Sequence, residues 1–248
     1  MSEHTPCRMR ITFRKKDPLK YISHLDLLRA WERILRRAGL PMAYSRGFSP
    51  HPRITIAMPL PVGCTGQAEV IDVILDEPLS ADEVIASLEP TLPRGISIVA
   101  VEQVPHKSPA LPSMIRQATY LITLVGVSKK EVEQRVADLM HRDTLQVEFR
   151  RKTFDLRPLI GSLALKRTLP RAEHWAHTPG ETDVPRAPHD PREAYDPCRY
   201  DTTTLEAALL RDKKGRIGRP DVLLKALGLS EYARRIDRVS ITFESRQV

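Results

Sequence analysis

Residues 44–63 read Y-S-R-G-F-S-P-H-P-R-I-T-I-A-M-P-L-P-V-G, and the first half of the chain is organised around this proline-rich stretch. Proline fixes its own φ and biases the preceding residue toward extended geometry. His51 stands between Pro50 and Pro52, so we predict that residues 48–53 form a stiff, extended segment that presents the imidazole. The alternative is a rigid connection at a sheet edge whose polar residues are only solvated.

We expect this segment to form one wall of a binding groove. A helix should precede it and a core strand should follow it, so rigid elements would hold both of its ends. Side chains whose directions are set in advance lower the ordering cost of binding. The alternative buries His51 and Phe48 beneath the sheet as a plug. The residues expected to line the groove are Tyr21, His24, Arg46, Phe48, His51 and Arg53.

Four motifs together resemble a known family. They are K-Y-I-S-H-L-D at 20–26, F-S-P-H-P-R-I at 48–54, D-L-R-P-L-I at 155–160 and G-R-P-D-V-L-L at 218–224. In these motifs the chain resembles the radical-SAM-linked protein family, bacterial proteins that occur beside, or fused to, a B12-binding-type radical SAM protein. The resemblance covers most of the chain. It implies a radical SAM protein as partner, and it implies no activity.

The composition indicates a basic protein of one large domain or two small ones. The chain has 248 residues, and 39 Lys and Arg against 31 Asp and Glu give a net charge of +8. Such a balance favours polyanionic partners, nucleic acid first. No apolar run has the length of a membrane span, and the N-terminus lacks an apolar stretch of the signal-peptide type. We therefore expect a cytoplasmic protein.

The cysteines indicate a reducing compartment. Cys7, Cys64 and Cys198 are odd in number and far apart, which does not fit a disulfide framework. A radical SAM cluster needs three closely spaced thiolates, and this chain lacks that spacing. We expect the protein to carry no cofactor and no metal of its own, and to act beside a radical SAM enzyme as its partner.

Residues 8–104 predict an alternation of strands and helices. Apolar residues at every second position indicate strands, and Ser-x-x-Asp or Ser-x-x-Glu pairs indicate helix starts. The expected elements are a strand at 8–14, a helix at 24–38 opened by Ser23, strands at 54–58 and 69–75, a helix opened by Ser80, and a strand at 96–104. This order, β-α-β-β-α-β, is the ferredoxin-like plan.

The order restarts after a proline-marked linker at 105–117. The expected elements are a strand at 119–125, a helix opened by Ser128, strands at 145–154 and 203–210, a helix at 220–227 and a final strand through Val239, Ile241 and Phe243. The composition of 203–210 also suits a helix. The sequence therefore predicts an α+β protein with two tandem ferredoxin-like subdomains, at 8–104 and 118–248.

The second subdomain contains a polar, proline-rich insertion at 169–200. Such a composition buries too little apolar surface to order itself, so a long mobile loop is expected. Its His174, His177 and His189 have no spacing that indicates a metal site.

Two histidines are candidates for chemistry. His24 and His51 could act as acid and base on RNA. The alternative, which we favour, is that each only hydrogen-bonds to backbone. Sequence patterns typical of nucleotide-binding loops, serine hydrolases and zinc peptidases are missing.

Phosphate contact is the expected mode of RNA binding. Aromatic residues make up only 5% of the chain, too few for a base-stacking sheet platform. Arginine and lysine would supply affinity with little base specificity. The loop at 211–220 ends at a helix N-terminus and is the best candidate, although Asp221 already complements the helix dipole there. The basic candidates in the second half are Arg157, Lys213, Lys214, Arg216 and Arg219.

Three hypotheses for function follow. The first is a non-catalytic, RNA-binding or substrate-presenting accessory partner of a radical SAM enzyme, in RNA modification. The second is a stand-alone RNA-processing or RNA-modifying enzyme that uses His24 and His51. The third is a protein-interaction adaptor with no nucleic acid contact. Salt dependence of binding separates the first from the third. The sequence leaves the substrate and the oligomeric state open.

Overall fold

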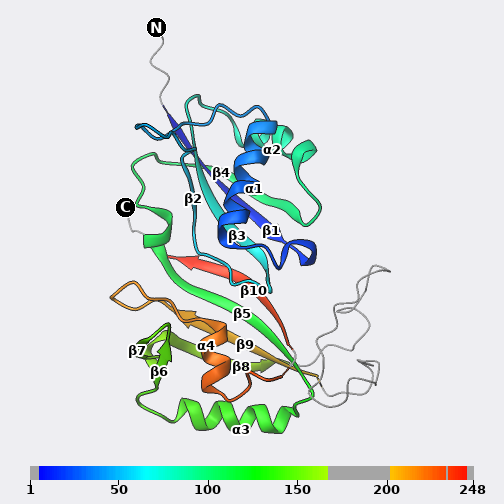
Figure 1. Ribbon diagram of the computed structural model, residues 1–248, viewed down its shortest axis with the longest axis vertical. Coiled ribbons are helices and arrows are strands. Elements are labelled where there is room, and N and C mark those ends of the chain that lie inside the picture. The colour runs from blue at the N-terminus through cyan, green and yellow to red at the C-terminus, as the bar shows by residue number, and fades with distance from the viewer. Residues whose placement is uncertain (1–5, 167–201, 233, 245–248) are drawn as a thin grey trace. The chain divides into compact units, whose positions relative to one another are not determined.

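A computed structural model describes residues 6–166, 202–232 and 234–244 (Figure 1). It is an α+β structure with a mostly antiparallel sheet and four α-helices in its described part, which confirms the predicted class. The chain divides into two compact units. Unit 1 comprises residues 1–118 and 237–248, and unit 2 comprises residues 119–236. The loop expected at 169–200 lies outside the described residues.

Unit 1 is built on a sheet with the strand order β4-β1-β3. β2 and the C-terminal strand β10 both lie on the other side of β3. β1 is antiparallel to both β3 and β4, and β2 is antiparallel to β3. The elements are β1 (Cys7–Lys15), η1 (Asp17–Leu19), α1 (His24–Arg37), β2 (Ile54–Ile56), β3 (Cys64–Leu75), α2 (Ala81–Leu88), η2 (Glu89–Thr91), β4 (Ile96–Val104), η3 (Leu111–Met114) and β10 (Arg234–Phe243).

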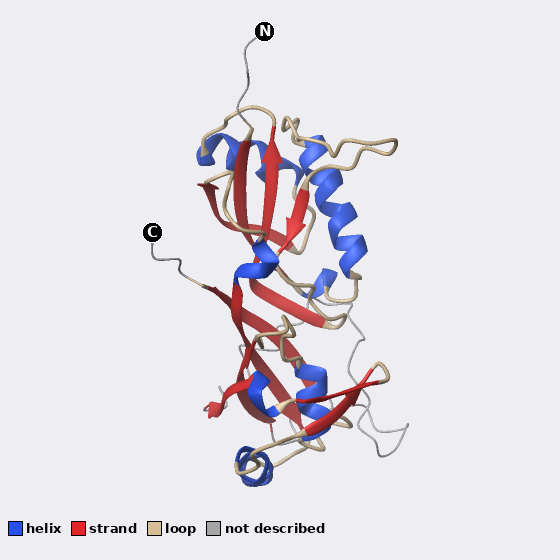
Figure 2. Ribbon diagram, turned by 90° about the vertical axis from the view of Figure 1, so that its left-hand side faces the viewer, coloured by secondary structure: helices blue, strands red, loops and turns tan. Residues whose placement is uncertain are grey.

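The core of unit 1 lies between the helices and one face of this sheet (Figure 2). Phe13 of β1 meets Trp31 of α1 edge to face, with ring centroids 4.8 Å apart, an arrangement that adds to the gain from apolar burial. Val84 and Leu88 of α2 join the same cluster. Helix starts agree with the sequence, because the hydroxyl of Ser23 accepts from the Asp26 amide and Ser80 forms a full capping box with Glu83.

Unit 2 has the strand order β10-β5-β9-β8, with a separate β6–β7 hairpin. β5 and β10 each contribute residues to both units. The elements are β5 (Ile115–Val125), α3 (Lys129–Met140), β6 (Gln146–Phe149), β7 (Lys152–Asp155), η4 (Arg157–Leu159), β8 (Ile160–Lys166), β9 (Thr202–Leu210) and α4 (Pro220–Ala226). Residues 203–210, which suited strand or helix, lie in a strand.

The strand expected at 145–154 is instead a hairpin. Arg150 and Arg151 have φ values of 50° and 61°, and they form the two-residue turn between β6 and β7. Two positive φ values match the right-handed twist of a hairpin, but Gly or Asn normally supplies them. Because arginine does not indicate a turn, the sequence predicted one continuous strand across these two residues.

None of the helices in the described ranges is both long enough and apolar enough to cross a membrane.

Candidate functional site

The proline-rich segment folds back on itself as a hairpin. Tyr44 forms a bridge with Pro52, the Ser45 amide donates to the His51 carbonyl at 2.8 Å, and the His51 amide donates to the Ser45 hydroxyl at 3.0 Å. Of the extended rod predicted at 48–53, residues 48 and 49 lie in the bend of a hairpin, at 46–49, and only residues 50–53 belong to its second arm. Gly47 has a φ of 143°, a conformation that side chains rarely adopt, and this lets the chain turn.

The side chains of this hairpin point into solvent. Phe48 is as exposed as in an extended peptide, with an exposed fraction of 110%, and Arg46, His51 and Arg53 are also exposed. The buried plug is thus excluded. Neither Arg46 nor Arg53 forms an ion pair with any described residue.

The structure does not form the predicted groove. The chain just before the hairpin bridges Leu75, at the end of β3, whereas Lys15 at the opposite end pairs with Gly66. Leu75 lies nine positions along the strand from Gly66, which corresponds to roughly 30 Å. Tyr21 and His24 follow Lys15, and the Gly63 amide donates to the Lys20 carbonyl beside them. They therefore lie at the opposite end of β3 from the hairpin.

The two candidate histidines have different surroundings. His24 is half-buried at the first position of α1, and its Nδ1 has no hydrogen-bond partner among the described atoms. Burial lowers the pKa of His24 from its ordinary value. His51 is exposed on the distant hairpin. The structure does not bring the two imidazoles together as an acid–base pair.

In unit 2, the two motifs that contain an Arg-Pro pair, at 155–160 and 218–224, contact each other. The Asp155 carboxylate accepts from the amides of Leu145, at 2.7 Å, and Arg157, at 3.0 Å, which fixes the turn at η4. A Cβ at Gly218 would lie 2.8 Å from the Leu159 carbonyl oxygen, so only glycine fits against η4 there. The Arg157 side chain donates back to Ile160. Arg157 is therefore held within its own segment.

An arginine–phenylalanine cluster joins the β6–β7 hairpin to the 211–219 loop. Arg219 lies over the Phe149 ring at 4.7 Å, and Arg216 lies over the Phe154 ring at 5.1 Å. Arg150 lies 5.3 Å from the Phe149 ring centroid. Two of the three arginines also pair with partly buried carboxylates: Asp221 pairs with Arg219, and Asp212 pairs with Arg216.

A basic rim surrounds this cluster. Its members are exposed and form no ion pair within the described ranges; they are Arg151, Lys152, Lys213 and Lys214. Sequence reasoning found Lys213, Lys214, Arg216 and Arg219 but missed Phe149, Phe154 and residues 150–152. The R-R-K run at 150–152 directly after an aromatic residue was the signal that could have found them.

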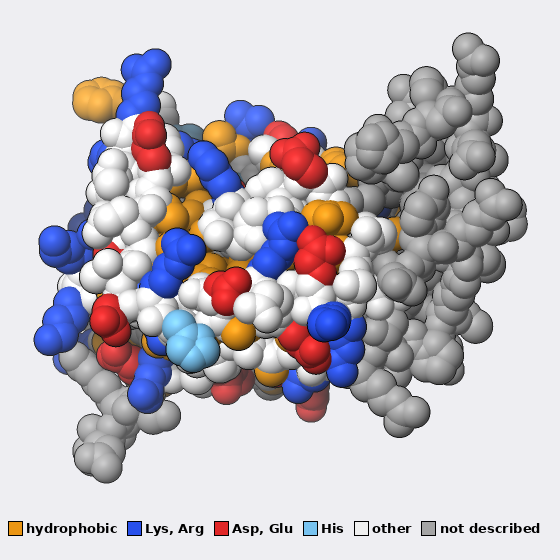
Figure 3. Space-filling view, turned by 90° about the horizontal axis from the view of Figure 1, so that it is seen from below, with side chains coloured by type: hydrophobic (Ala, Val, Ile, Leu, Met, Phe, Trp, Pro, Cys, Tyr) orange, Lys and Arg blue, Asp and Glu red, His pale blue; other side chains and the backbone are white. Residues whose placement is uncertain are grey.

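The α3 side of unit 2 has a different charge pattern. Figure 3 shows lysine and arginine side chains interspersed there with aspartate and glutamate. On α3 itself, Lys129 pairs with Glu133 and Arg135 pairs with Glu131. Alternating signs make this side a poor phosphate surface, and it supplies control positions for tests of the basic rim.

Comparison with known proteins places the chain in a bacterial family. Residues 8–184 match the family described as "Uncharacterized protein conserved in bacteria (DUF2344)". The chain belongs to this family. No curated protein matches the chain. In the described part of this DUF2344 protein, no group of three or more His, Cys, Asp or Glu side chains is placed to hold a metal ion.

Unit 1 of the DUF2344 protein contains a buried lysine that the sequence did not reveal. Lys15 is 1% exposed, and its Nζ donates to the carbonyls of Lys20 and Cys64, each at 3.3 Å. Burial lowers the pKa of Lys15, and the nearby Glu69 carboxylate partly offsets that effect. These two hydrogen bonds fix the end of β1 to the segments at Lys20 and Cys64.

Replacing Lys15 with Met should flatten the pH dependence of stability. With a lowered pKa, the folded chain loses the Lys15 proton at a lower pH than the unfolded chain, whose pKa is near 10.5. Between the two values the unfolded state binds more protons, so the free energy of unfolding should rise with pH. Urea denaturation of both proteins between neutral pH and pH 10.5 tests this. A wild-type-minus-Met difference that is constant with pH would contradict it.

Proposed function

We propose that the protein is a non-catalytic RNA-binding accessory protein, and that it contacts RNA phosphates through the arginine–phenylalanine cluster and basic rim of unit 2. The observation that carries this proposal is the convergence of the β6–β7 hairpin and the 211–219 loop. Together they present three guanidinium groups on aromatic rings and four exposed basic side chains.

The cluster suits phosphate rather than base recognition. A guanidinium over an aromatic ring is held in position, and planar N–H pairs match phosphate oxygens. Arg150 is exposed and forms no ion pair with a described residue, whereas Asp221 and Asp212 already accept from Arg219 and Arg216. A phosphate would therefore have to share or displace those two carboxylates. Phe149 carries two arginines, Arg150 and Arg219, so those guanidiniums compete with bases for its ring faces. Binding through such a surface follows the shape and charge of RNA and has little sequence preference.

We also propose that both units follow the ferredoxin-like plan. In unit 1 the support is the chain order β1-α1-β2-β3-α2-β4 with the pairings β4-β1-β3-β2. In unit 2 the support is the order β10-β5-β9-β8, in which α3 follows β5 and α4 follows β9. On this plan the β6–β7 hairpin is an insertion into unit 2. The insertion would then supply half of the RNA surface.

The radical SAM partner belongs to the same proposal. Its support is the resemblance of the motifs at 20–26 and 48–54, and membership of DUF2344 adds no partner. An accessory role fits a protein whose candidate histidines lie at opposite ends of one strand. The modified RNA would be presented to the partner, which would supply the chemistry.

Removing two rim charges should weaken RNA binding in a salt-dependent way. Fluorescence anisotropy with a labelled single-stranded RNA and a labelled RNA hairpin would measure affinity over a range of salt. Each lost phosphate contact lowers the slope of log K against log salt by about 0.7 for single strands, so Lys213→Ala/Lys214→Ala should lower it by about 1.4. The loss should be similar for unrelated sequences.

The matched control removes two charges from the α3 side. Lys130→Ala/Arg142→Ala changes net charge equally at exposed positions outside the rim, so the slope should stay within error of the wild type. Equal losses in both double variants, or no binding at low salt, would overturn the proposal. Turnover of RNA by the protein alone would favour the enzyme hypothesis instead.

A further inference from the structure

The hairpin at residues 44–52 presents an apolar ring at its tip, and the described residues leave this ring fully exposed. Phe48 has an exposed fraction of 110%, larger than that of the other exposed large hydrophobic residues in the described ranges. A phenylalanine left in water forgoes the free energy that its burial would contribute. Single exposed apolar side chains are common, so exposure alone does not define a site.

The hairpin that holds this ring is braced at its base. The Ser45 and His51 backbones are linked in both directions, the second of these bonds through the Ser45 hydroxyl. Below them the Arg53 amide donates to the Ala43 carbonyl at 2.9 Å, and the Ala43 amide donates to Ile74 of β3 at 2.9 Å. Pro50 and Pro52 remove further freedom from the second arm. The tip is therefore carried on an ordered base, which lowers the entropy cost of docking.

The charged side chains of the hairpin segment itself have one sign. Residues 44–53, Y-S-R-G-F-S-P-H-P-R, contain two arginines, one histidine and no acidic residue. Arg46 and Arg53 form no ion pair with described residues, and both are exposed. A complementary surface would carry carboxylates around an apolar centre.

We propose that this hairpin is a docking element, and that Phe48 inserts into an apolar pocket, rimmed by Asp and Glu, on a protein partner. The geometry favours a pocket over a nucleobase. Rings that stack on bases lie on a sheet or groove floor, beside a basic track that follows the RNA backbone. Phe48 projects instead from the tip of a loop, as aromatic anchors do that dominate protein interfaces. This surface lies in unit 1, and the proposal does not depend on RNA binding by unit 2.

A photo-crosslinker at position 48 would identify the occupant. The full chain carrying benzoylphenylalanine at position 48 would be irradiated in the bacterium that encodes it, with the same group at Val99, an exposed position on β4, as control. We expect a protein adduct at position 48 that is missing at position 99, attached to an apolar segment with flanking Asp or Glu. The crosslinked protein would then be purified and titrated against the unmodified chain.

In that titration, Phe48→Ala should weaken binding about thirty-fold or more, as expected for an anchor residue. Phe48→Leu should recover part of the loss, Arg46→Glu should slow association, and Val99→Ala should change nothing. The melting temperature of Phe48→Ala should match the wild type, because no described residue buries the ring. RNA-only adducts, the same adducts at both positions, no protein adduct at position 48, or unchanged affinity in Phe48→Ala would overturn the proposal.

Discussion

Replacing Glu69 with Gln should lower the free energy of unfolding by about 3–5 kcal/mol, the usual cost of breaking a buried ion pair from one side. Its partner, Arg238 of β10, has an exposed fraction of 0%. The Arg238 Nε donates to a Glu69 oxygen at 2.8 Å, and its Nη2 donates to the Met58 carbonyl at 2.8 Å and to the second Glu69 oxygen. Glutamine keeps the shape of glutamate but removes the negative charge to which the buried guanidinium donates through two nitrogens.

Urea denaturation followed by circular dichroism would measure the loss. The matched control is Asp221→Asn, which breaks the partly exposed ion pair with Arg219 and should cost less than about 1 kcal/mol. The double variant Glu69→Met/Arg238→Met should be less destabilised than Glu69→Gln, because it removes both charges together. A Glu69→Gln protein as stable as the wild type would show that the pair is solvated.

The Glu69–Arg238 ion pair joins the C-terminal strand β10 to the rest of unit 1. Arg238 lies near the C-terminus in sequence. Its side chain donates to the Met58 carbonyl and so fixes the segment that precedes β3. Its neighbour Asp237 accepts a hydrogen bond from the Thr65 hydroxyl. Residues 237–243 are therefore part of unit 1, although 118 residues separate them from the rest of it. The domain boundary predicted from the sequence, which assigns these residues to a C-terminal subdomain at 118–248, stays a prediction.

Local signals explain what could be predicted from the sequence. The helices opened by Ser23, Ser80 and Ser128 were found because a capping serine and an acidic residue three positions later interact within one turn. The strand at 96–104 was predicted because it is rich in β-branched residues and has glycine and proline next to its ends. These features need no knowledge of the rest of the chain.

Long-range pairing explains what could not be predicted. Arg238 alternates with apolar residues in β10, so it reads as a solvent-facing position, yet its carboxylate partner lies 169 positions away. Arg219 and Phe149 are likewise brought together only by the fold. The hairpin at 44–52 was missed because only the fold brings Ser45 to His51, where a backbone bond and the Ser45 hydroxyl link them. Neither periodicity nor proline content reports such contacts.

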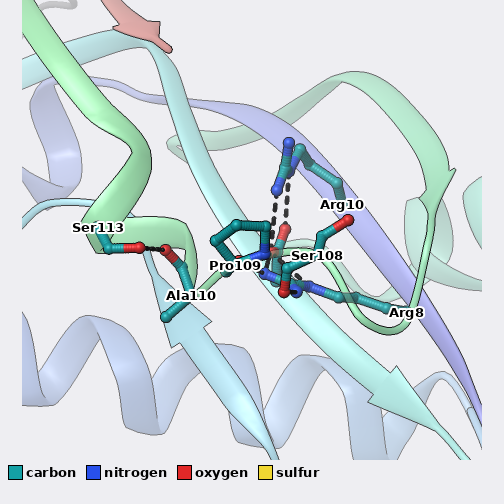
Figure 4. Close-up of polar contacts among 7 residues, drawn as sticks. Arg8, Arg10, Ser108, Pro109, Ala110 and Ser113 are labelled. Carbon is teal, nitrogen blue, oxygen red and sulfur yellow. Dashed lines mark hydrogen bonds and ion pairs between the residues drawn. The ribbon is translucent and has the colours of Figure 1, made fainter. Parts of the chain in front are cut away.

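A second buried carboxylate, Asp72 of β3, holds two arginines of β1. The Arg8 Nε donates to Asp72 at 2.8 Å and the Arg10 Nε at 2.9 Å. Arg8 also donates to the carbonyls of Ser108, at 2.7 Å, and Pro109, at 3.0 Å (Figure 4). Through Arg8, the segment expected to be a linker is fastened to the sheet of unit 1.

Asp72→Asn should therefore have two effects. It should lower the free energy of unfolding by about 3 kcal/mol, because Arg8 is buried and loses its counter-charge. It should also loosen the segment around Ser108, because the Arg8 side chain is then no longer held in place by Asp72. Hydrogen exchange should show faster exchange at residues 105–110 under native conditions, beyond what the global loss of stability explains.

Arg10→Gln is the control that separates the two effects. It removes one of the two arginines from Asp72 but leaves Arg8, with its bonds to Asp72, Ser108 and Pro109, in place. Stability should fall by less than in Asp72→Asn, and exchange at 105–110 should stay as in the wild type. Equal loosening in both variants would mean that charge on the sheet face, and not the Arg8 contacts, orders the segment. Because Arg8 meets both Asp72 and the two carbonyls, the carboxylate orders a stretch of chain that it does not touch.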